Sequence, residues 1–177
     1  MKQQSSSKSA GLLYTEEERA RRDATRWTLV QGLLAPAQFL VFIVSLFLVI
    51  RYLWTGEGYE AATISILIKT GFLYLIMVTG AIWEKVVFGC YLFAPAFFWE
   101  DVFSFIVIAL HTAYVLALFD QSMTTTGLMT IALLAYATYV INAAQFIWKL
   151  RMARLDAESR AAGARADGST KAAEVAS

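Results

Sequence analysis

The residues with which this sequence could do chemistry are ionisable side chains set within, or at the edges of, long apolar stretches. They are Lys69, Glu84, Lys85, Glu100, Asp101 and His111. Because an ionisable group is costly to keep in an apolar environment, each is a candidate functional residue. Carboxyl, amine and imidazole groups together suit general acid–base chemistry. The chain has one histidine and one cysteine, which excludes sites that need two histidines or a cysteine cluster.

Glu100 and Asp101 are the most conspicuous of these residues, because they directly follow Phe97, Phe98 and Trp99. Two carboxyls beside aromatic residues indicate a site for proton transfer. The alternative is structural, since acids at the beginning of a helix are favoured by its dipole and can cap its free N–H groups. Successive helical residues point about 100° apart, so one of the two could cap the helix while the other acts on a substrate.

Lys69 and His111 lie deeper in apolar stretches, and each also has a structural alternative. Lys69 could extend to the membrane interface or pair with Glu57 or Glu60. His111 lies on the same helical stripe as Glu100, about 16 Å deeper at about 1.5 Å per residue. It is either a ligand to a bound group or a residue that hydrogen-bonds between helices.

Residues 85–99 are strongly apolar and rich in aromatic side chains, although they connect two stretches that each indicate a helix. Connections between bundled helices commonly have only about 2–8 residues. We expect this segment to fold back over the bundle or to lie in the membrane interface, with Glu84 and Lys85 at one end and Glu100 and Asp101 at the other. An aromatic floor rimmed by carboxylates would suit a flat, apolar ligand. A plain interfacial anchor is the alternative.

Four apolar stretches must position these residues, at about 27–54, 61–83, 102–119 and 127–148. Each reaches the roughly 18–20 residues that cross about 30 Å of hydrocarbon, and a backbone in lipid must satisfy its own hydrogen bonds. All five tryptophans fall at the ends of these stretches, as in an interfacial aromatic belt. With 58% hydrophobic and 16% charged residues, the chain is predicted to be an all-α integral-membrane bundle of four transmembrane helices.

The basic residues predict how this bundle is oriented. Of fifteen Lys and Arg residues, six lie in 1–26 and six in 149–177. Cytoplasmic segments carry an excess of Lys and Arg, so both termini and the connection at 84–101 are predicted to be cytoplasmic. The net charge of +1 gives no indication of nucleic-acid binding.

The membrane domain is predicted to span residues 14–155. Residues 1–13 and 156–177 are rich in polar, small or mixed-charge residues and are predicted to be disordered tails. Thr15 and Glu18 have the spacing of a capping box, which predicts a short charged helix before the first span.

Several blocks of sequence carry a resemblance. Residues 82–89 read Ile-Trp-Glu-Lys-Val-Val-Phe-Gly, residues 93–101 read Phe-Ala-Pro-Ala-Phe-Phe-Trp-Glu-Asp, and residues 110–114 read Leu-His-Thr-Ala-Tyr. Together with residues 27–32, they make the chain resemble the vinyl bacteriochlorophyllide hydratase family over about residues 13–155. These are small membrane proteins of bacteriochlorophyll biosynthesis in photosynthetic bacteria.

The resemblance implies a hydro-lyase. Its substrate would be chlorophyllide a or 3-vinyl bacteriochlorophyllide a, a magnesium chlorin whose C3-vinyl group gains water to give the 3-(1-hydroxyethyl) product. The resemblance also implies the bacterial inner (photosynthetic intracytoplasmic) membrane as location, contact with membrane lipid, and association with other enzymes of pigment biosynthesis. We expect no cofactor and no resident metal, because adding water to a vinyl group involves no redox step.

The reaction puts a proton on the terminal vinyl carbon and a water on the resulting cation, so an acid, a base and an electrostatic partner suffice. We expect Glu100 to be the protonated acid, because its neighbours are apolar, and Asp101 or Glu84 to orient and deprotonate the water. The sequence leaves the reverse assignment open. Lys85 would pair with a substrate propionate, and His111 would ligate the magnesium or hold a water. The other predicted substrate contacts are aromatic: Phe97, Phe98 and Trp99.

Two other classes of function stay open from the residues alone. A non-catalytic membrane anchor that binds a pigment or haem would need an axial ligand, and the chain has only His111 to supply one. A small transporter would use Lys69, Glu84 and His111 as a relay. Bound pigment without turnover would favour the anchor, whereas solute flux in proteoliposomes would favour the transporter.

Overall fold

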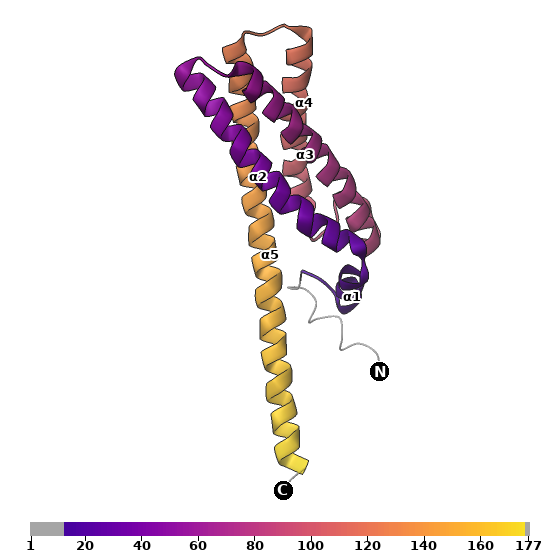
Figure 1. Ribbon diagram of the computed structural model, residues 1–177. Helices are drawn as coiled ribbons and strands as arrows, with labels where there is room; N and C mark the ends of the chain where they lie inside the picture. The colour runs from indigo at the N-terminus through magenta and orange to yellow at the C-terminus, as the bar shows by residue number, and fades with distance from the viewer. Residues whose placement is uncertain (1–12, 176–177) are drawn as a thin grey trace.

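The computed structural model describes the backbone of residues 13–175 and the side chains of residues 13–160, 162 and 163. Its elements are α1 (Glu16–Ala24), α2 (Arg26–Thr55), α3 (Tyr59–Phe88), α4 (Phe98–Asp120) and α5 (Thr125–Val175) (Figure 1). No strand occurs in this described part, in agreement with the predicted all-α class. The tail predicted at 1–13 lies outside the described residues, except for Leu13.

The four long helices correspond to the four predicted spans. Helices α2, α3, α4 and the part of α5 from Thr125 to Arg160 are each long and apolar enough to cross a membrane, with mean hydropathies between 1.5 and 2.6. Only 22–39% of each apolar window is buried inside the protein. The remaining apolar side chains therefore face outward, as lipid-facing residues do.

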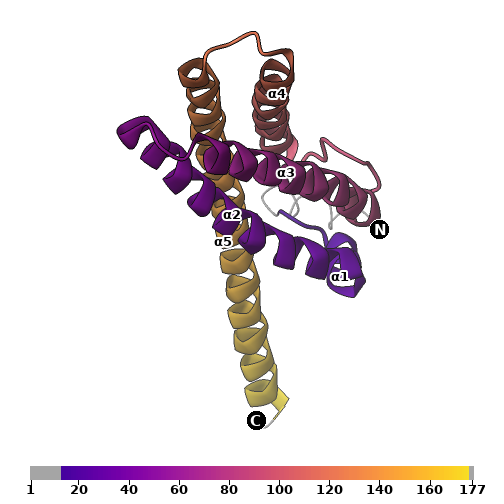
Figure 2. The same cartoon turned by 45° about the horizontal axis from the view of Figure 1, so that its top comes forward.

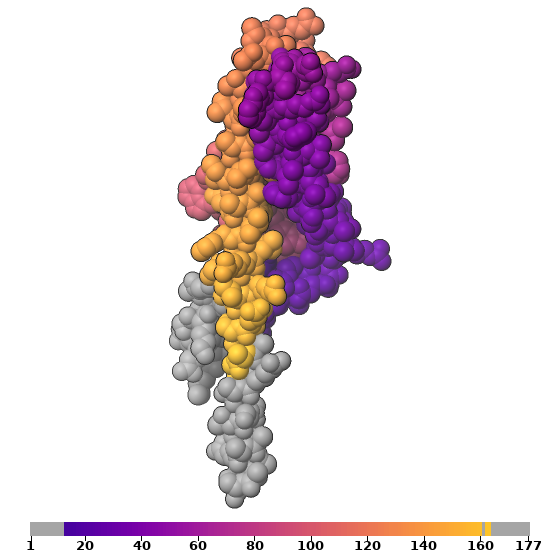
Figure 3. Space-filling view, turned by 60° about the vertical axis from the view of Figure 1, so that its left-hand side comes forward, coloured from indigo at the N-terminus to yellow at the C-terminus, as the bar shows by residue number. Residues whose placement is uncertain are grey.

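The long helices form two hairpins, α2–α3 and α4–α5. The first turns at Gly56 and Gly58, whose φ angles of 75° and 86° are readily adopted by glycine. Packing is most extensive within each hairpin, and the two hairpins cross and touch over a smaller area (Figures 1 and 2). The space-filling view shows α2, in indigo and purple, lying against the orange part of α5 (Figure 3).

The main core lies where the hairpins cross, and all four long helices contribute to it. Its large buried side chains include Phe42, Ile66, Val107 and Tyr136. A second, smaller cluster is centred on Tyr14, Val87 and Phe97. It lies at one end of the bundle, which we call the loop end. This end contains α1, residues 89–97 and the part of α5 where the helix leaves the bundle (Figure 1).

Helix α1 begins at the predicted capping box. The Glu18 N–H donates to Thr15 Oγ1 at 3.2 Å, and the Thr15 N–H donates to Glu18 Oε2 at 2.8 Å. These bonds satisfy two N–H groups that the first helical turn would otherwise leave free. Helix α1 then joins α2 at Thr25, so the N-terminal part of the described chain is fixed at the loop end.

Helix α5 continues far beyond the bundle and remains helical to Val175 (Figure 1). The sequence predicted a disordered tail at 156–177, whereas the structure has helix over 156–175. Residues 176–177 lie outside the described range. Alanine, arginine and glutamate favour helix, and no proline interrupts this segment. Arg154 Nε also donates to Glu158 Oε1 one turn further on, at 3.1 Å.

Candidate functional site

The three carboxyls grouped by the sequence analysis come together at the loop end. Glu84 lies near the C-terminus of α3, whereas Glu100 and Asp101 lie in the first turn of α4. Residues 89–97 join these two helices and cover the carboxyls, which are only 5%, 4% and 3% exposed. A carboxyl that is shielded from water in this way needs partners within the protein.

Glu84 and Asp101 are partners of each other and of the loop. Their carboxyl groups are close enough to interact electrostatically. The Phe93 N–H donates to Asp101 Oδ2 at 2.6 Å, and the Ala94 N–H donates to Glu84 Oε2 at 3.2 Å. Two carboxylates held together away from water repel each other, and a proton on one of them relieves that repulsion. This pair, which we call the acid pair, is therefore suited to hold and release a proton.

Glu100 has a different environment from the acid pair. Its Oε2 lies 3.5 Å from Lys149 Nζ, on α5, and accepts no hydrogen bond from the described residues. Lys149 Nζ also donates to the Ala96 carbonyl and lies 5.6 Å from the centre of the Phe97 ring. Glu100 is thus a buried carboxyl that faces a cation and has an oxygen free to accept a proton.

Neither acid caps α4, which was the structural alternative for one of them. The N-cap residue is Phe97, and no side chain bonds to the free N–H groups there. Asp101 instead accepts from Phe93, four residues before the helix cap in sequence. The Asp101 side chain therefore stabilises the loop, whereas its own N–H donates to the Phe97 carbonyl.

The aromatic residues around the carboxyls divide into two groups. Phe97 is buried between α3 and α5, with its ring stacked on Phe146 at 6.1 Å. An outer group, which we call the aromatic face, is exposed and comprises Phe93, Phe98, Trp99 and Phe105. Successive rings in it lie 5.5–5.7 Å apart, and those of Phe93 and Phe105 are stacked. The single floor of Phe97, Phe98 and Trp99 that the sequence predicted is therefore divided, with Phe97 inside.

Tyr14 is a neighbour of the site that sequence reasoning missed. Its ring stacks on Phe88 at 5.7 Å, and the Arg22 guanidinium lies 4.8 Å from its centre. Burial raises the pKa of the Tyr14 hydroxyl above its ordinary value of 10.0. Arg21 Nε donates to the Val87 carbonyl at 2.8 Å, so α1 is attached to the end of α3. In the sequence, only the position of Tyr14 next to the Thr15–Glu18 capping box could have indicated that it packs at this site.

Lys85 lies at the loop end but outside the buried cluster. Its ammonium donates to the Gly89 carbonyl at 2.8 Å and lies 5.2 Å from the centre of the Tyr91 ring. A lysine in the last turn that bonds a carbonyl stabilises the helix C-terminus. Because the side chain is exposed, its charge is also accessible to a ligand at this end.

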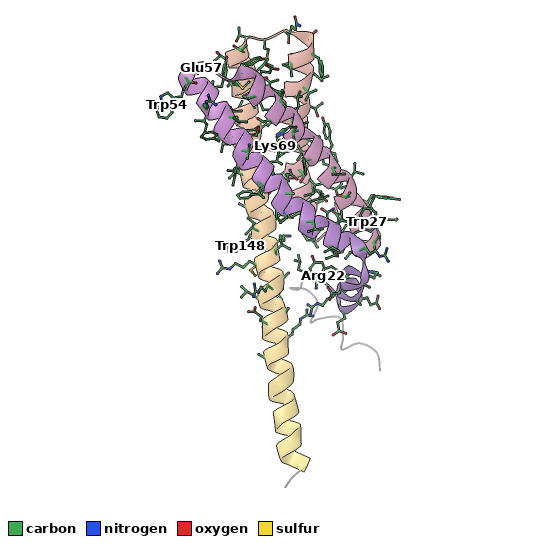
Figure 4. All side chains as sticks on the ribbon, viewed as in Figure 1. Arg22, Trp27, Trp54, Glu57, Lys69 and Trp148 are labelled. Atoms are coloured by element: carbon green, nitrogen blue, oxygen red, sulfur yellow. The ribbon has the colours of Figure 1, made fainter. Side chains whose placement is uncertain are left out.

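Lys69, which is labelled in Figure 4, and His111 meet near the middle of α3 and α4, whereas the three carboxyls lie at the ends of these helices. Lys69 Nζ lies 3.1 Å from His111 Nε2, and His111 Nδ1 bonds the Val107 carbonyl at 2.8 Å. Lys69 is 0% exposed, so the alternative that it reaches the interface or pairs with Glu57 or Glu60 is wrong. Both ring nitrogens of His111 have protein partners, so neither is free here to ligate a magnesium ion.

Three aromatic rings surround the Lys69 ammonium. The ring centres of Tyr139, Tyr136 and Phe42 lie 4.0, 5.2 and 5.8 Å from Nζ. Aromatic faces attract cations, so these rings replace part of the hydration that the ammonium loses on burial. Helices α2, α3, α4 and α5 all contribute to this arrangement, which therefore holds the two hairpins at their crossing.

These features define an all-helical membrane protein with a buried cluster of acids at one end of a four-helix bundle. The chain belongs to the 2-vinyl bacteriochlorophyllide hydratase (BCHF) family, whose sequence model matches residues 14–152.

Two relatives are similar along most of their length, and both are named 2-vinyl bacteriochlorophyllide hydratase. The protein of Rhodobacter capsulatus is 77% identical over 151 residues, which cover 85% of this chain and 88% of the relative. The protein of Cereibacter sphaeroides is 78% identical over 148 residues, covering 83% and 91%. No solved structure matches the chain.

Proposed function

We propose that this chain is a hydro-lyase that adds water to the vinyl group of a magnesium chlorin. Its substrate would be chlorophyllide a or 3-vinyl bacteriochlorophyllide a, and its product the 1-hydroxyethyl compound. The observation that carries the proposal is the meeting of three buried carboxyls beside an exposed aromatic face at one end of a membrane bundle. The names of the two relatives support the same reaction.

The acid pair is proposed to supply the proton. Glu84 and Asp101 are neighbouring buried carboxyls, which favours a proton on one of them that can be donated. The π electrons of the vinyl group form the new C–H bond at the terminal carbon. The positive charge then lies on the carbon next to the macrocycle, where conjugation spreads it into the ring. The negative charge left on the pair stabilises this cation.

Glu100 is proposed to act as the base. A water attacks the cationic carbon through its oxygen, and Glu100 takes the proton that the water releases. The free Oε2 of Glu100 and its ion pair with Lys149 support this role. One proton has then moved from the acid pair to Glu100, and its return through solvent completes the cycle. This assignment reverses the expectation that Glu100 is the acid and Asp101 or Glu84 the base.

The macrocycle is proposed to lie on the aromatic face. Phe98, Trp99 and their neighbours Phe93 and Phe105 offer a ring-stacking surface that faces outward, so a pigment dissolved in lipid could reach it directly. Lys85 is exposed at the same end and is proposed to pair with a propionate of the pigment. Phe97 contributes to the packing behind this surface, and we assign no substrate contact to His111.

The loop end is proposed to face the cytoplasm of a photosynthetic inner membrane. The basic residues of α1 and those of α5 from Lys149 onward lie at this end, as the orientation rule for membrane proteins requires. The acids would then lie at the inner surface, within reach of water and of other membrane-bound enzymes of pigment synthesis.

The test is hydration of vinyl substrate by membranes that contain the full chain. Wild-type membranes should convert chlorophyllide a to a product heavier by one water, as measured by mass spectrometry. Glu100→Gln and Asp101→Asn should each lower turnover by about 10²–10⁴-fold, the usual range for losing a general acid or base. Glu57→Gln, at the opposite end of the bundle, is the matched control and should retain wild-type turnover.

Two outcomes would overturn the proposal. Wild-type turnover in Glu100→Gln and Asp101→Asn would remove these groups from the reaction. Stoichiometric bound pigment with no gain of water in the wild type would favour the non-catalytic pigment-binding anchor.

A further inference from the structure

Lys149 has been named so far only as the ion-pair partner of Glu100, and it is the basic side chain that contacts the buried acids. Among the described residues, it alone has an amine within ion-pair distance of Glu84, Glu100 or Asp101. It belongs to α5, the last helix to enter the bundle, and its sequence position marks it only as the first basic residue after a span.

The position of Lys149 is fixed by contacts on either side of it. Asn142 Nδ2, two turns earlier in α5, donates to Ser104 Oγ at 2.9 Å, one turn after Glu100 in α4. Phe146 stacks on Phe97, the last residue of the loop. These contacts set the register of α5 against α4, so Lys149 lies opposite Glu100 rather than a turn away.

The Lys149 ammonium joins two parts of the site. One contact is the Glu100 carboxyl and the other is the Ala96 carbonyl, in the loop that covers the acid pair. Two other cations near the covering loop are engaged elsewhere: Arg21 bonds the Val87 carbonyl and Lys85 bonds the Gly89 carbonyl. Neither is placed to replace Lys149.

We infer that Lys149 is a positioning residue for the hydration reaction: its ion pair holds the Glu100 carboxyl in place and separate from the acid pair. This inference rests on the proposed function. Three buried carboxyls lie together at this end of the bundle. A third acid in contact with the acid pair could take up the proton of that pair and would then no longer act as a base. The ion pair with Lys149 prevents this by holding the Glu100 carboxyl apart from the acid pair.

The experiment compares Lys149→Met, Lys149→Arg and the exposed control Arg151→Met in membranes with chlorophyllide a. Lys149→Met should lower kcat about 100-fold and change KM less than about threefold, because it removes the positioning of the base and no substrate contact. Lys149→Arg keeps the charge and should recover kcat to within about tenfold of wild type. Arg151→Met should match wild type. Each rate is expressed per folded protein, measured from the helical circular dichroism of the purified chain.

The decisive measurement is kcat of the double variant that combines Lys149→Met with Glu100→Gln. If Lys149 acts through Glu100, Lys149→Met should cause no further loss of kcat once Glu100 is neutral, because effects of residues that act as a unit are not additive. Additive losses, a raised KM with unchanged kcat, or failure of Lys149→Arg to recover activity would each overturn the inference. A wild type with no hydration activity would instead overturn the proposed function, so the two failures are distinguishable.

Discussion

The buried pair of Lys69 and His111 gives the sharpest test of how this bundle is held together. Because His111 Nδ1 bonds a backbone carbonyl, its Nε2 presents a lone pair to the Lys69 ammonium at 3.1 Å. Removing the histidine and removing the lysine should therefore have unequal effects. His111→Leu leaves an ammonium buried without a hydrogen-bond acceptor, whereas Lys69→Met leaves only a neutral ring nitrogen unpaired.

The magnitudes follow from what each substitution leaves behind. Lys69→Met loses one hydrogen bond between helices, which costs about 0.6–1.7 kcal/mol in a membrane bundle. His111→Leu should cost about 3 kcal/mol, the lower end for removing one partner of a buried charge, since the three aromatic rings remain as partners. The double variant removes both groups and should cost about 1 kcal/mol, which makes the interaction energy about −3 kcal/mol.

The assay is reversible unfolding of the purified protein in mixed micelles, followed by circular dichroism, for the wild type and the three variants. Equal costs for the two single variants, or a double variant that loses the sum of both, would refute the reasoning that Lys69 carries the charge and His111 accepts from it. Hydration by the folded double variant should remain within about threefold of wild type, since the pair lies about 16 Å along α4 from Glu100. A large loss of turnover in a stable double variant would return His111 to the list of substrate contacts.

Two further predictions concern the loop end. Phe93 has a φ of 59°, a backbone conformation that costs a residue with a side chain about 1–2 kcal/mol. Phe93→Gly should therefore be more stable than Phe93→Ala by about 1 kcal/mol in the same unfolding assay. Equal stabilities would show that this backbone conformation is not retained without the ring. Because the pKa of Tyr14 is raised in the folded state, the stabilisation by its neutral hydroxyl is present below pH 10 and is lost as pH rises above that value. The protection factor of the α1 amides against hydrogen exchange should therefore fall above pH 10 in the wild type but not in Tyr14→Phe, and an identical fall in both would contradict this.

The elements could be predicted from the sequence because the bilayer imposes strong local constraints. The apolar stretches, the tryptophans at their ends and the Thr15–Glu18 capping box each depend on a few neighbouring residues. The continuous helix of α5 beyond residue 155 was not predicted, because its alanine- and charge-rich composition suits both a solvated tail and a helix.

The contacts of the site depended on tertiary packing, so the sequence could not specify them. A helix that is apolar on all sides gives no indication of which face meets its neighbour. Lys69 therefore had no identifiable partner until the crossing of the hairpins placed it against His111. For the same reason, nothing in the run Phe97-Phe98-Trp99 indicated that the first ring is buried and the next two are exposed.

Two lysines, the buried Lys69 and the half-buried Lys149, show how the fold separates stability from chemistry. At the crossing, Lys69 faces an imidazole and aromatic rings, which satisfy its ammonium and leave no carboxyl there to accept or release a proton. At the loop end, Lys149 forms an ion pair with the Glu100 carboxyl, whose Oε2 accepts no hydrogen bond from the described residues and can still react. Exchanging the partners of the two lysines would be unfavourable at both ends. A carboxyl at the crossing would neutralise Lys69 at a place where no substrate binds. An imidazole at position 100 would repel Lys149 when protonated. Substitutions of the acids at the loop end should therefore leave the packing at the hairpin crossing unchanged. Substitutions of Lys69 or His111 should leave the arrangement of the acids unchanged.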